Sequence, residues 1–257
     1  MTPLQVVLGV LTGLAAGILA GMFGVGGGIV QTPAISVLLG APPLVAVATP
    51  LPVIFPTAIV GAWTYRRAGE IDLRAAAWMS IPGALASAGG AALTRVVDGH
   101  LLLLVTAVLL AWQAVHVARG KGVQPANEPS NSPWAYAAIG IAAGFTSGLL
   151  GIGGGLVMVP LLAGVLGMPL KRALGTSLAA IVVLVIPGTI VHAALGNIDW
   201  AIFAVLTAGS ILGVRIGAKL ALGTRERTLR LIVGAFLGVV AIAYGAAELA
   251  NLTRDGG

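Results

Sequence analysis

The sequence predicts an all-α, polytopic membrane protein made of two related halves. Extreme hydrophobicity, an internal repeat and glycine-rich interruptions of the apolar segments support this fold class. The chain has 257 residues, 58% of them hydrophobic and 9% charged, and its mean hydropathy is +1.04. Soluble domains carry about 25% charged residues. A chain this apolar cannot cover itself with polar surface, so lipid must surround much of it, and lipid favours helices whose backbone groups bond internally.

The internal repeat keeps one register over most of each half. Gly24-Val25-Gly26-Gly27-Gly28 recurs as Gly151-Ile152-Gly153-Gly154-Gly155, so each residue has its counterpart 127 positions later. The same offset, without a gap, relates Gly13, Gly17, Gly21, Pro33, Thr49, Gly69, Asp72 and Gly90 to Gly140, Gly144, Gly148, Pro160, Thr176, Gly196, Asp199 and Gly217. Chance similarity between two Ala/Gly-rich segments would not preserve this register through prolines, a threonine and an aspartate.

Each half contains the same series of apolar segments. They cover residues 4–22, 29–39, 44–65, 73–93 and 101–117, and then 135–150, 156–166, 173–195, 201–222 and 229–249. A complete span needs about 20 residues, so 29–39 and 156–166 are too short. We expect them to be half-helices of hairpins bent at the glycines. The polar segment 119–133 predicts a cytoplasmic linker between an N-terminal repeat, 1–118, and a C-terminal repeat, 134–257.

The distribution of arginine and lysine predicts that the two halves have inverted topology. Basic residues cluster in the connections at 66–74, 119–121, 171–172 and 225–230, which we place in the cytoplasm. The connection at 196–200 has none and that at 95–100 has one, so these are expected outside. Connection 66–74 and its counterpart 196–200 therefore lie on opposite sides. Both termini are expected outside, and the first apolar segment, which has no preceding basic residue, belongs to the mature fold.

The composition excludes several kinds of active site. The chain has no cysteine, which removes disulfides, thiolate metal sites and thiol nucleophiles. It also shows no HExxH, P-loop lysine or paired carboxylates in a suitable context. We therefore expect no enzyme activity, no cofactor and no metal. The net charge of +6 suits a small anionic substrate or anionic membrane lipid, although basic loops that fix topology explain it equally well. No nucleic-acid partner is expected.

The glycine clusters are the main candidate substrate site. A helix that restarts after them exposes unpaired N–H groups at its positive end, which is a ready anion-binding arrangement. The candidates are Gly24, Gly26, Gly27, Gly28, Gly151, Gly153, Gly154 and Gly155. The glycines spaced by four, at 13, 17 and 21 and at 140, 144 and 148, instead favour close helix packing. Such faces could serve within one chain or between two, so a homodimer is an alternative.

Five further polar residues in apolar segments are candidates for substrate binding. Gln31, whose counterpart is Met158, could donate from its amide or form an interhelical hydrogen bond. Thr49, Thr176 and Ser177 could donate to an oxyanion or bond back to their own helix. Arg215 could hold an oxyanion with its guanidinium group, and its counterpart is Ala88. Asp72 and Asp199 are expected to be helix N-caps.

These motifs resemble the sulfite exporter TauE/SafE family. The resemblance rests on the doubled Gly-x-Gly-Gly-Gly segments, each with an apolar pair and a proline downstream, and on Gly175-Thr176-Ser177-Leu178. It covers nearly the whole chain outside the linker, and the first half departs from it where Pro50 replaces the serine at 177. The resemblance implies a multi-pass carrier of the bacterial inner (plasma) membrane for sulfite, an organosulfonate or a related sulfur oxyanion.

The function expected from the sequence is secondary transport, with export of such an anion by alternating access around the two glycine-broken hairpins near the bilayer midplane. Inverted repeats with interrupted helices are a recurring plan of secondary transporters. A passive anion channel and a non-transporting membrane assembly subunit are the alternatives. No carboxylate lies deep in a span, so no intramembrane proton relay is visible.

Overall fold

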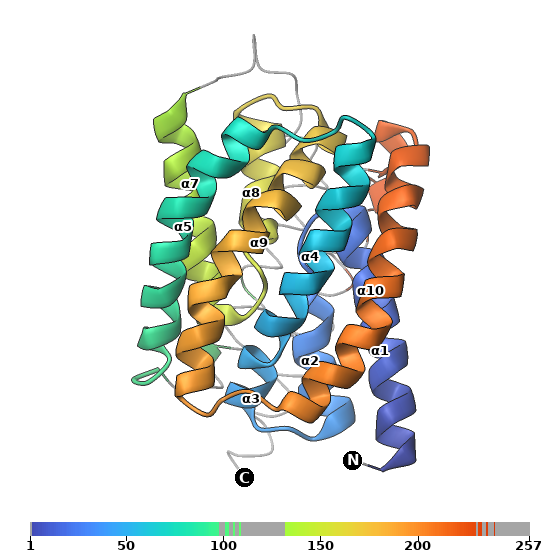
Figure 1. Ribbon diagram of the computed structural model, residues 1–257, viewed down its shortest axis with the longest axis vertical. Helices are drawn as coiled ribbons and strands as arrows, with labels where there is room; N and C mark the ends of the chain where they lie inside the picture. Colours follow the sequence, from blue (N-terminus) through green and yellow to red (C-terminus); the bar gives the residue numbers. More distant parts are fainter. Residues whose placement is uncertain are drawn as a thin grey trace.

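The described part of the protein is a bundle of helices that run mainly along its long axis (Figure 1). The computed structural model describes residues 2–97, 101, 102, 105, 108, 132–229, 231, 232, 235 and 239. Among these residues all regular structure is helical, which confirms the predicted fold class. Most of the predicted spans 101–117 and 229–249, and nearly all of the linker 119–133, lie outside the described residues.

The first half begins with α1 (Pro3–Phe23), which starts at a complete capping box. The Thr2 hydroxyl accepts from the Gln5 N–H at 3.3 Å, and the Gln5 side chain accepts from the Thr2 N–H at 2.8 Å. The helix ends at Gly24, whose φ of 67° is left-handed. There follow α2 (Gly28–Leu39), α3 (Pro43–Ala48), α4 (Pro50–Arg67) and α5 (Leu73–Leu93).

The second half repeats this order with one difference in continuity. It contains α7 (Pro133–Leu150), α8 (Gly155–Pro160), the π-helical turn η1 (Leu161–Val165), α9 (Leu170–Ala194) and α10 (Trp200–Gly223). The predicted segment 44–65 forms one candidate span, Pro43–Arg67. α9 is one helix, whereas in its counterpart the helical hydrogen bonds are interrupted at Thr49, between α3 and α4. The reason is Pro50, which has no N–H to continue the helical hydrogen bonds, where the second half has Ser177.

Five helices are long and apolar enough to cross a membrane, by length and composition. They are α1, α3 and α4 taken together, α7, α9 and α10. The segments after the glycine clusters, Gly28–Leu39 and Gly155–Val165, are apolar but shorter than a span. The predicted half-helices are thus confirmed, and the chain is a multi-pass membrane protein.

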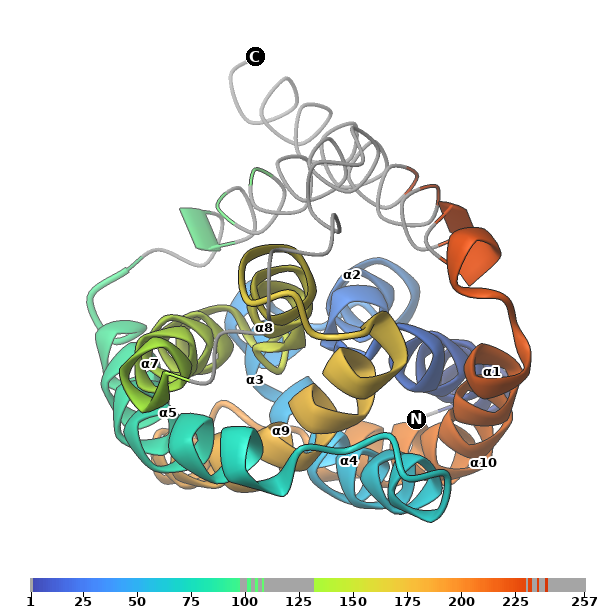
Figure 2. The same cartoon turned by 90° about the horizontal axis from the view of Figure 1, so that it is seen from above.

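The first helix of each half packs against the last described helix of the other half. Seen from above, α1 lies beside α10 at one side of the bundle and α5 beside α7 at the other (Figure 2). The glycines spaced by four make these contacts: a Cβ on Gly17 would meet the Ser210 carbonyl oxygen, and a Cβ on Gly144 would meet that of Gly83. Ser210 and Gly83 are themselves counterparts. The packing role of these glycines is confirmed, and it operates within one chain.

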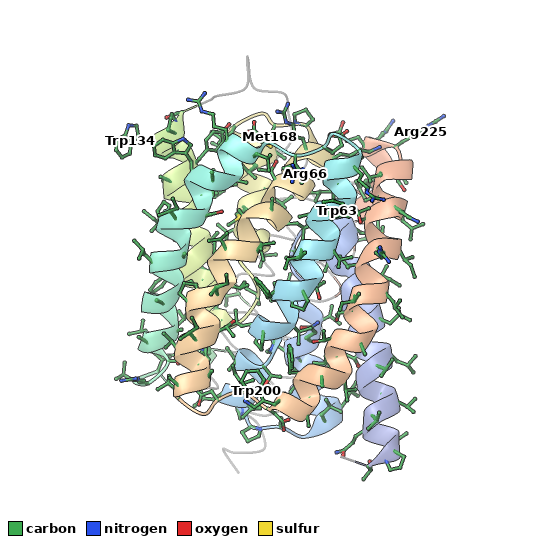
Figure 3. All side chains as sticks on the ribbon, viewed as in Figure 1. Trp63, Arg66, Trp134, Met168, Trp200 and Arg225 are labelled. Atoms are coloured by element: carbon green, nitrogen blue, oxygen red, sulfur yellow. The ribbon has the colours of Figure 1, made fainter. Side chains whose placement is uncertain are left out.

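The two ends of the bundle differ in charge. Trp63, Arg66, Trp134, Met168 and Arg225 lie at one end and Trp200 at the other (Figure 3). We call the first the basic end, because it carries the connections 66–74, 166–172 and 223–227. Of the described residues near the opposite end, Arg95 alone is basic. α4 finishes at the basic end and α9 starts there, so these counterparts run in opposite directions (Figure 1).

Candidate functional site

Two glycine turns interrupt the helical hairpins at the centre of the bundle. We call residues 24–28 the first glycine turn and residues 151–155 the second. In the first, Gly26 and Gly27 have φ of 82° and 90°, and in the second their counterparts have 79° and 75°. L-residues with a side chain rarely adopt these angles, so the chain can reverse here only because glycine is present. The predicted bends at both clusters are confirmed.

The two glycine turns lie against each other, which the sequence did not reveal. A Cβ on Gly28 would lie 2.8 Å from the Ile152 Cα, and a Cβ on Gly155 would lie 2.6 Å from the Val25 Cα. The contact is therefore reciprocal and made by backbone. The Ile54 side chain is 3.0 Å from Cβ positions built on both Gly26 and Gly153, so it packs against both turns.

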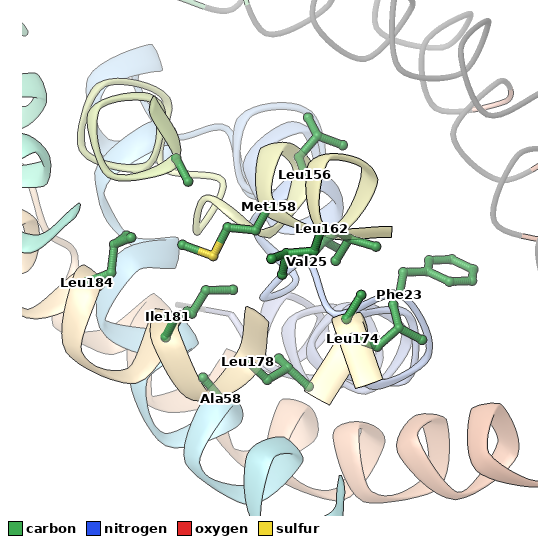
Figure 4. Packing of buried hydrophobic residues seen from close by; sticks show 14 of the residues in the cluster. Phe23, Val25, Ala58, Leu156, Met158, Leu162, Leu174, Leu178, Ile181 and Leu184 are labelled. Carbon is green, nitrogen blue, oxygen red and sulfur yellow. The ribbon is translucent and has the colours of Figure 1, made fainter. Parts of the chain in front are cut away.

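Apolar side chains surround the glycine turns. Val25 of the first turn, Met158 of α8 and Ile181 of α9 gather in the same hydrophobic core (Figure 4). All five residues of each turn are buried. Among the described residues no lysine, arginine, aspartate or glutamate is buried, so any polar ligand at the turns would meet backbone groups and neutral side chains.

The helices that start at the turns offer backbone donors. α2 begins at Gly28 and α8 at Gly155. Within the described part of the chain, no acceptor binds the N–H group of either residue. Helix starts carry partial positive charge. An anion is therefore the kind of ligand that these two helix starts would favour.

Gln31 is the polar side chain beside the first glycine turn. It is fully buried, and its Nε2 lies 3.5 Å from a Cβ built on Gly27. Nε2 donates to the Ser210 hydroxyl at 3.1 Å, and that hydroxyl donates to the Gly13 carbonyl at 3.0 Å. The interhelical hydrogen bond considered from the sequence is thus present. Gln31 Oε1 and the neighbouring Thr32 hydroxyl are buried without a partner among the described residues.

Ser177 connects α9 to the first glycine turn. Its hydroxyl lies 2.8 Å from the Gly24 carbonyl oxygen and 2.9 Å from that of Leu174 in its own helix. One hydroxyl hydrogen can serve only one of these acceptors at a time. The counterpart Pro50 can make neither bond, so α9 alone has this link.

The hydroxyl groups of Thr49 and Thr176 each accept a hydrogen bond from a backbone N–H group in the other half. The Thr176 hydroxyl accepts from the Asp72 N–H at 2.9 Å, and the Thr49 hydroxyl accepts from the Asp199 N–H at 3.1 Å. Asp72 and Asp199 are the N-caps of α5 and α10, as predicted. The two threonines therefore tie each half to the other at equivalent places.

Arg215 does not lie with the other candidates. Its side chain is exposed on α10, whereas Gly213 and Gly217 of the same helix are buried against α1. Residues two positions apart on a helix point about 200° apart, so the packing of those glycines turns Arg215 outward. The glycine turns are buried, and the structure does not bring Arg215 to them.

A second pair of equivalent contacts is not among those predicted from the sequence. The Tyr65 hydroxyl donates to the Gly21 carbonyl at 2.8 Å, and the His192 Nε2 is 3.0 Å from the Gly148 carbonyl oxygen. Both side chains are buried, and both carbonyls lie just before a glycine turn. The shared register of Tyr65 and His192 was the signal that could have found them. Elsewhere among the described residues, no three His, Asp or Glu side chains gather as metal ligands would.

The geometry defines a class: a multi-pass helical membrane protein whose interrupted helices meet at its centre, as in secondary transporters. Comparison with known proteins gives the family. The model of the sulfite exporter TauE/SafE family matches residues 9–244, and the chain belongs to this family.

Relatives across bacteria and archaea are similar over nearly their full length. The chain is 28% identical to a probable membrane transporter protein of Xylella fastidiosa, over 95% of this chain and 94% of that protein. It is 26% identical to one of Methanocaldococcus jannaschii, over 91% and 92%, and 27% identical to YunE of Bacillus subtilis, over 87% and 91%. No solved structure gives a significant match. The family and these names identify the chain as a membrane transporter.

Proposed function

We propose that the protein is a secondary transporter that exports a small sulfur-containing anion, such as sulfite or an organosulfonate, across the bacterial inner membrane. The family name supports this substrate class, and the names of the relatives support transport. The observation that carries the proposal is the reciprocal contact of the two glycine turns at the centre of the bundle.

The substrate would bind where the two helix starts converge. Sulfite and sulfonate oxygens are strong hydrogen-bond acceptors, and the Gly28 and Gly155 N–H groups lack acceptors in the described residues. The second hydrogen of Gln31 Nε2 supplies a further donor on one side. Because these donors are neutral, they would hold the anion less tightly than a buried basic side chain, and the anion can also dissociate.

Alternating access would follow from inverted halves. In this proposal the basic end faces the cytoplasm, in keeping with the positive-inside rule, and the two halves are inverted repeats. The Ile54 side chain packs against both glycine turns where they meet. Transport would then require Ile54 to withdraw while the bundle opens from one end and afterwards from the other.

Counterflow in proteoliposomes tests the proposal. Vesicles are preloaded with unlabelled sulfite, and uptake of radiolabelled sulfite is followed. We expect uptake to be faster than in vesicles without sulfite inside, and to be lost in Gly27→Val and Gly154→Val, because both positions have positive φ. Gly89→Val is the matched control, since a Cβ there meets nothing within 4 Å and its φ is ordinary.

Three outcomes would contradict parts of the proposal. Normal counterflow in a folded Gly154→Val protein would remove the glycine turns from the mechanism. Rapid sulfite flux without acceleration by internal sulfite would indicate a channel. Absence of flux with sulfite and with methanesulfonate, in folded wild-type protein, would exclude this substrate class.

A further inference from the structure

Two cavities lie at opposite ends of the bundle, at equivalent positions of the repeat. The one at the basic end has a volume of about 330 Å³ and the other about 570 Å³. Leu166, Pro169 and Asp72 line the first, and their counterparts Leu39, Pro42 and Asp199 line the second. We call them the basic-end vestibule and the opposite vestibule. Five of the seven residues that line the basic-end vestibule have counterparts in the lining of the other, so the two can be compared position by position.

Charge is the main difference between the vestibules. Arg74 and Arg172 line the basic-end vestibule together with one carboxylate, that of Asp72. Among the described residues that line the opposite vestibule, Asp199 alone is charged, and Val45 stands where Arg172 stands in the other. A concave site lined mainly by one sign of charge concentrates ions of the other sign, so only the basic-end vestibule attracts anions.

The two guanidinium groups retain donors for a ligand. Arg172 Nη2 lies 3.3 Å from Asp72 Oδ2, and the Arg172 side chain is 47% exposed. A guanidinium group has five N–H donors, so this single contact leaves several available. Exposed ion pairs of this kind contribute at most about 1 kcal/mol, so an oxyanion can compete with Asp72. Arg74 forms no ion pair or hydrogen bond with any described residue.

The wall of the basic-end vestibule is linked to the first glycine turn. The Asp72 N–H donates to the Thr176 hydroxyl, and the next residue, Ser177, contacts the Gly24 carbonyl. In the opposite vestibule Asp199 has the equivalent bond to Thr49, but the next residue is Pro50. The vestibule with the arginines is therefore also the one with a hydrogen-bonded connection to a turn.

We propose that the basic-end vestibule is a capture site for small oxyanions, held by Arg172 and Arg74, and that the opposite vestibule is not. The substrate class rests on the proposed function, whereas the binding of an oxyanion by these arginines does not. The anion would be loaded from the basic end and released at the other end, whose described lining has no basic residue to hold it.

The absence of cysteine allows a direct test, because one introduced cysteine is the only thiol. Met168→Cys places it in the basic-end vestibule, and its counterpart Ala41→Cys places it in the opposite vestibule. Each variant is treated with methanethiosulfonates that carry a sulfonate, a trimethylammonium or a neutral group. We expect the anionic reagent to react about tenfold faster than the cationic one at Met168→Cys. At Ala41→Cys we expect no such preference.

Arginine variants and a competing anion distinguish anion binding by the lining arginines from attraction by the overall positive charge of the basic end. Arg172→Gln with Arg74→Gln should abolish the anionic preference at Met168→Cys. Arg225→Gln with Arg227→Gln, at the same end but outside the lining, should leave it unchanged. Methanesulfonate should slow labelling of Met168→Cys by the neutral reagent, whereas choline chloride at equal ionic strength should not.

Several results would overturn the capture site. These are equal anionic preference in both vestibules, no effect of the lining arginines, no protection by methanesulfonate, or a Met168→Cys thiol that no reagent reaches. Labelling requires no transport, so it is independent of the counterflow experiment. Normal labelling with no flux of sulfite or methanesulfonate would remove the proposed function and keep the capture site.

Discussion

The two halves of the molecule share their packing contacts and differ in their polar chemistry. Tyr65 and His192 bind equivalent carbonyls, Thr49 and Thr176 accept from equivalent N–H groups, and equivalent glycine faces bring the outer helices together. By contrast, Gln31 has an apolar counterpart, Ser177 corresponds to a proline, and one vestibule alone has arginines. The repeated contacts hold the bundle, whereas the unrepeated groups belong to the sites that we propose for the substrate.

The largest expected effect concerns the glycines spaced by four, which pack α1 against α10 and α7 against α5. Gly17→Val and Gly144→Val each place a side chain against the backbone of a neighbouring helix, so the helices must separate. We expect each to cost about 3 kcal/mol or more and to lower the unfolding temperature in detergent by about 6–12 °C. Gly89→Val should change it little. A large effect of one variant and none of the other would break the equivalence of the two helix pairs.

The threonine bonds give a smaller test of the same equivalence. Thr49→Val and Thr176→Val keep the side-chain shape but leave the Asp199 or Asp72 N–H without its acceptor. We expect each to destabilise the protein by about 1–3 kcal/mol, with effects that match within experimental error. Thermal unfolding in detergent measures both, with Thr49→Ser and Thr176→Ser as controls that retain the hydroxyl. Unequal losses would show that one half holds the bundle more than the other.

The smallest expected effect tests where the halves differ. Ser177→Ala removes the hydroxyl next to the Gly24 carbonyl and should cost about 1 kcal/mol, a fall of about 2–4 °C in the unfolding temperature. Pro50→Ala, at the counterpart position, has no such bond to lose and should not show this fall. A loss at Pro50→Ala as large as that at Ser177→Ala would contradict the assigned asymmetry.

The fold could be predicted because its signals are local or repeated. The glycine clusters, the short segments after them and the caps at Asp72 and Asp199 are visible in the sequence, since each depends on neighbouring residues. The interruption of helical hydrogen bonding at Thr49 lies directly before Pro50, which is also visible in the sequence. Apolar composition alone does not show where a long helix is interrupted.

The candidate site was predicted less completely because its geometry depends on contacts between the halves. Nothing in either cluster indicates that Gly28 meets Ile152 and Gly155 meets Val25. The outward direction of Arg215 could have been inferred from the glycines at 209, 213 and 217, which mark the packed face of α10. The partners of Thr49 and Thr176 are 150 and 104 residues distant, and no local pattern identifies them.

The first helix of each half packs against a helix of the other half, and this arrangement also sets the order in which the protein can be completed during synthesis. The hydrogen bond from Ser210 to the Gly13 carbonyl joins residues 197 positions apart. At translation rates of about 5–20 residues per second, α1 enters the membrane some 10–40 s before its partner α10 exists. Throughout that interval its glycine face has only lipid or the insertion machinery as a neighbour. Neither half contains the partner of its own first helix, so a half-length nascent chain is an unfinished folding unit that needs the rest of the polypeptide.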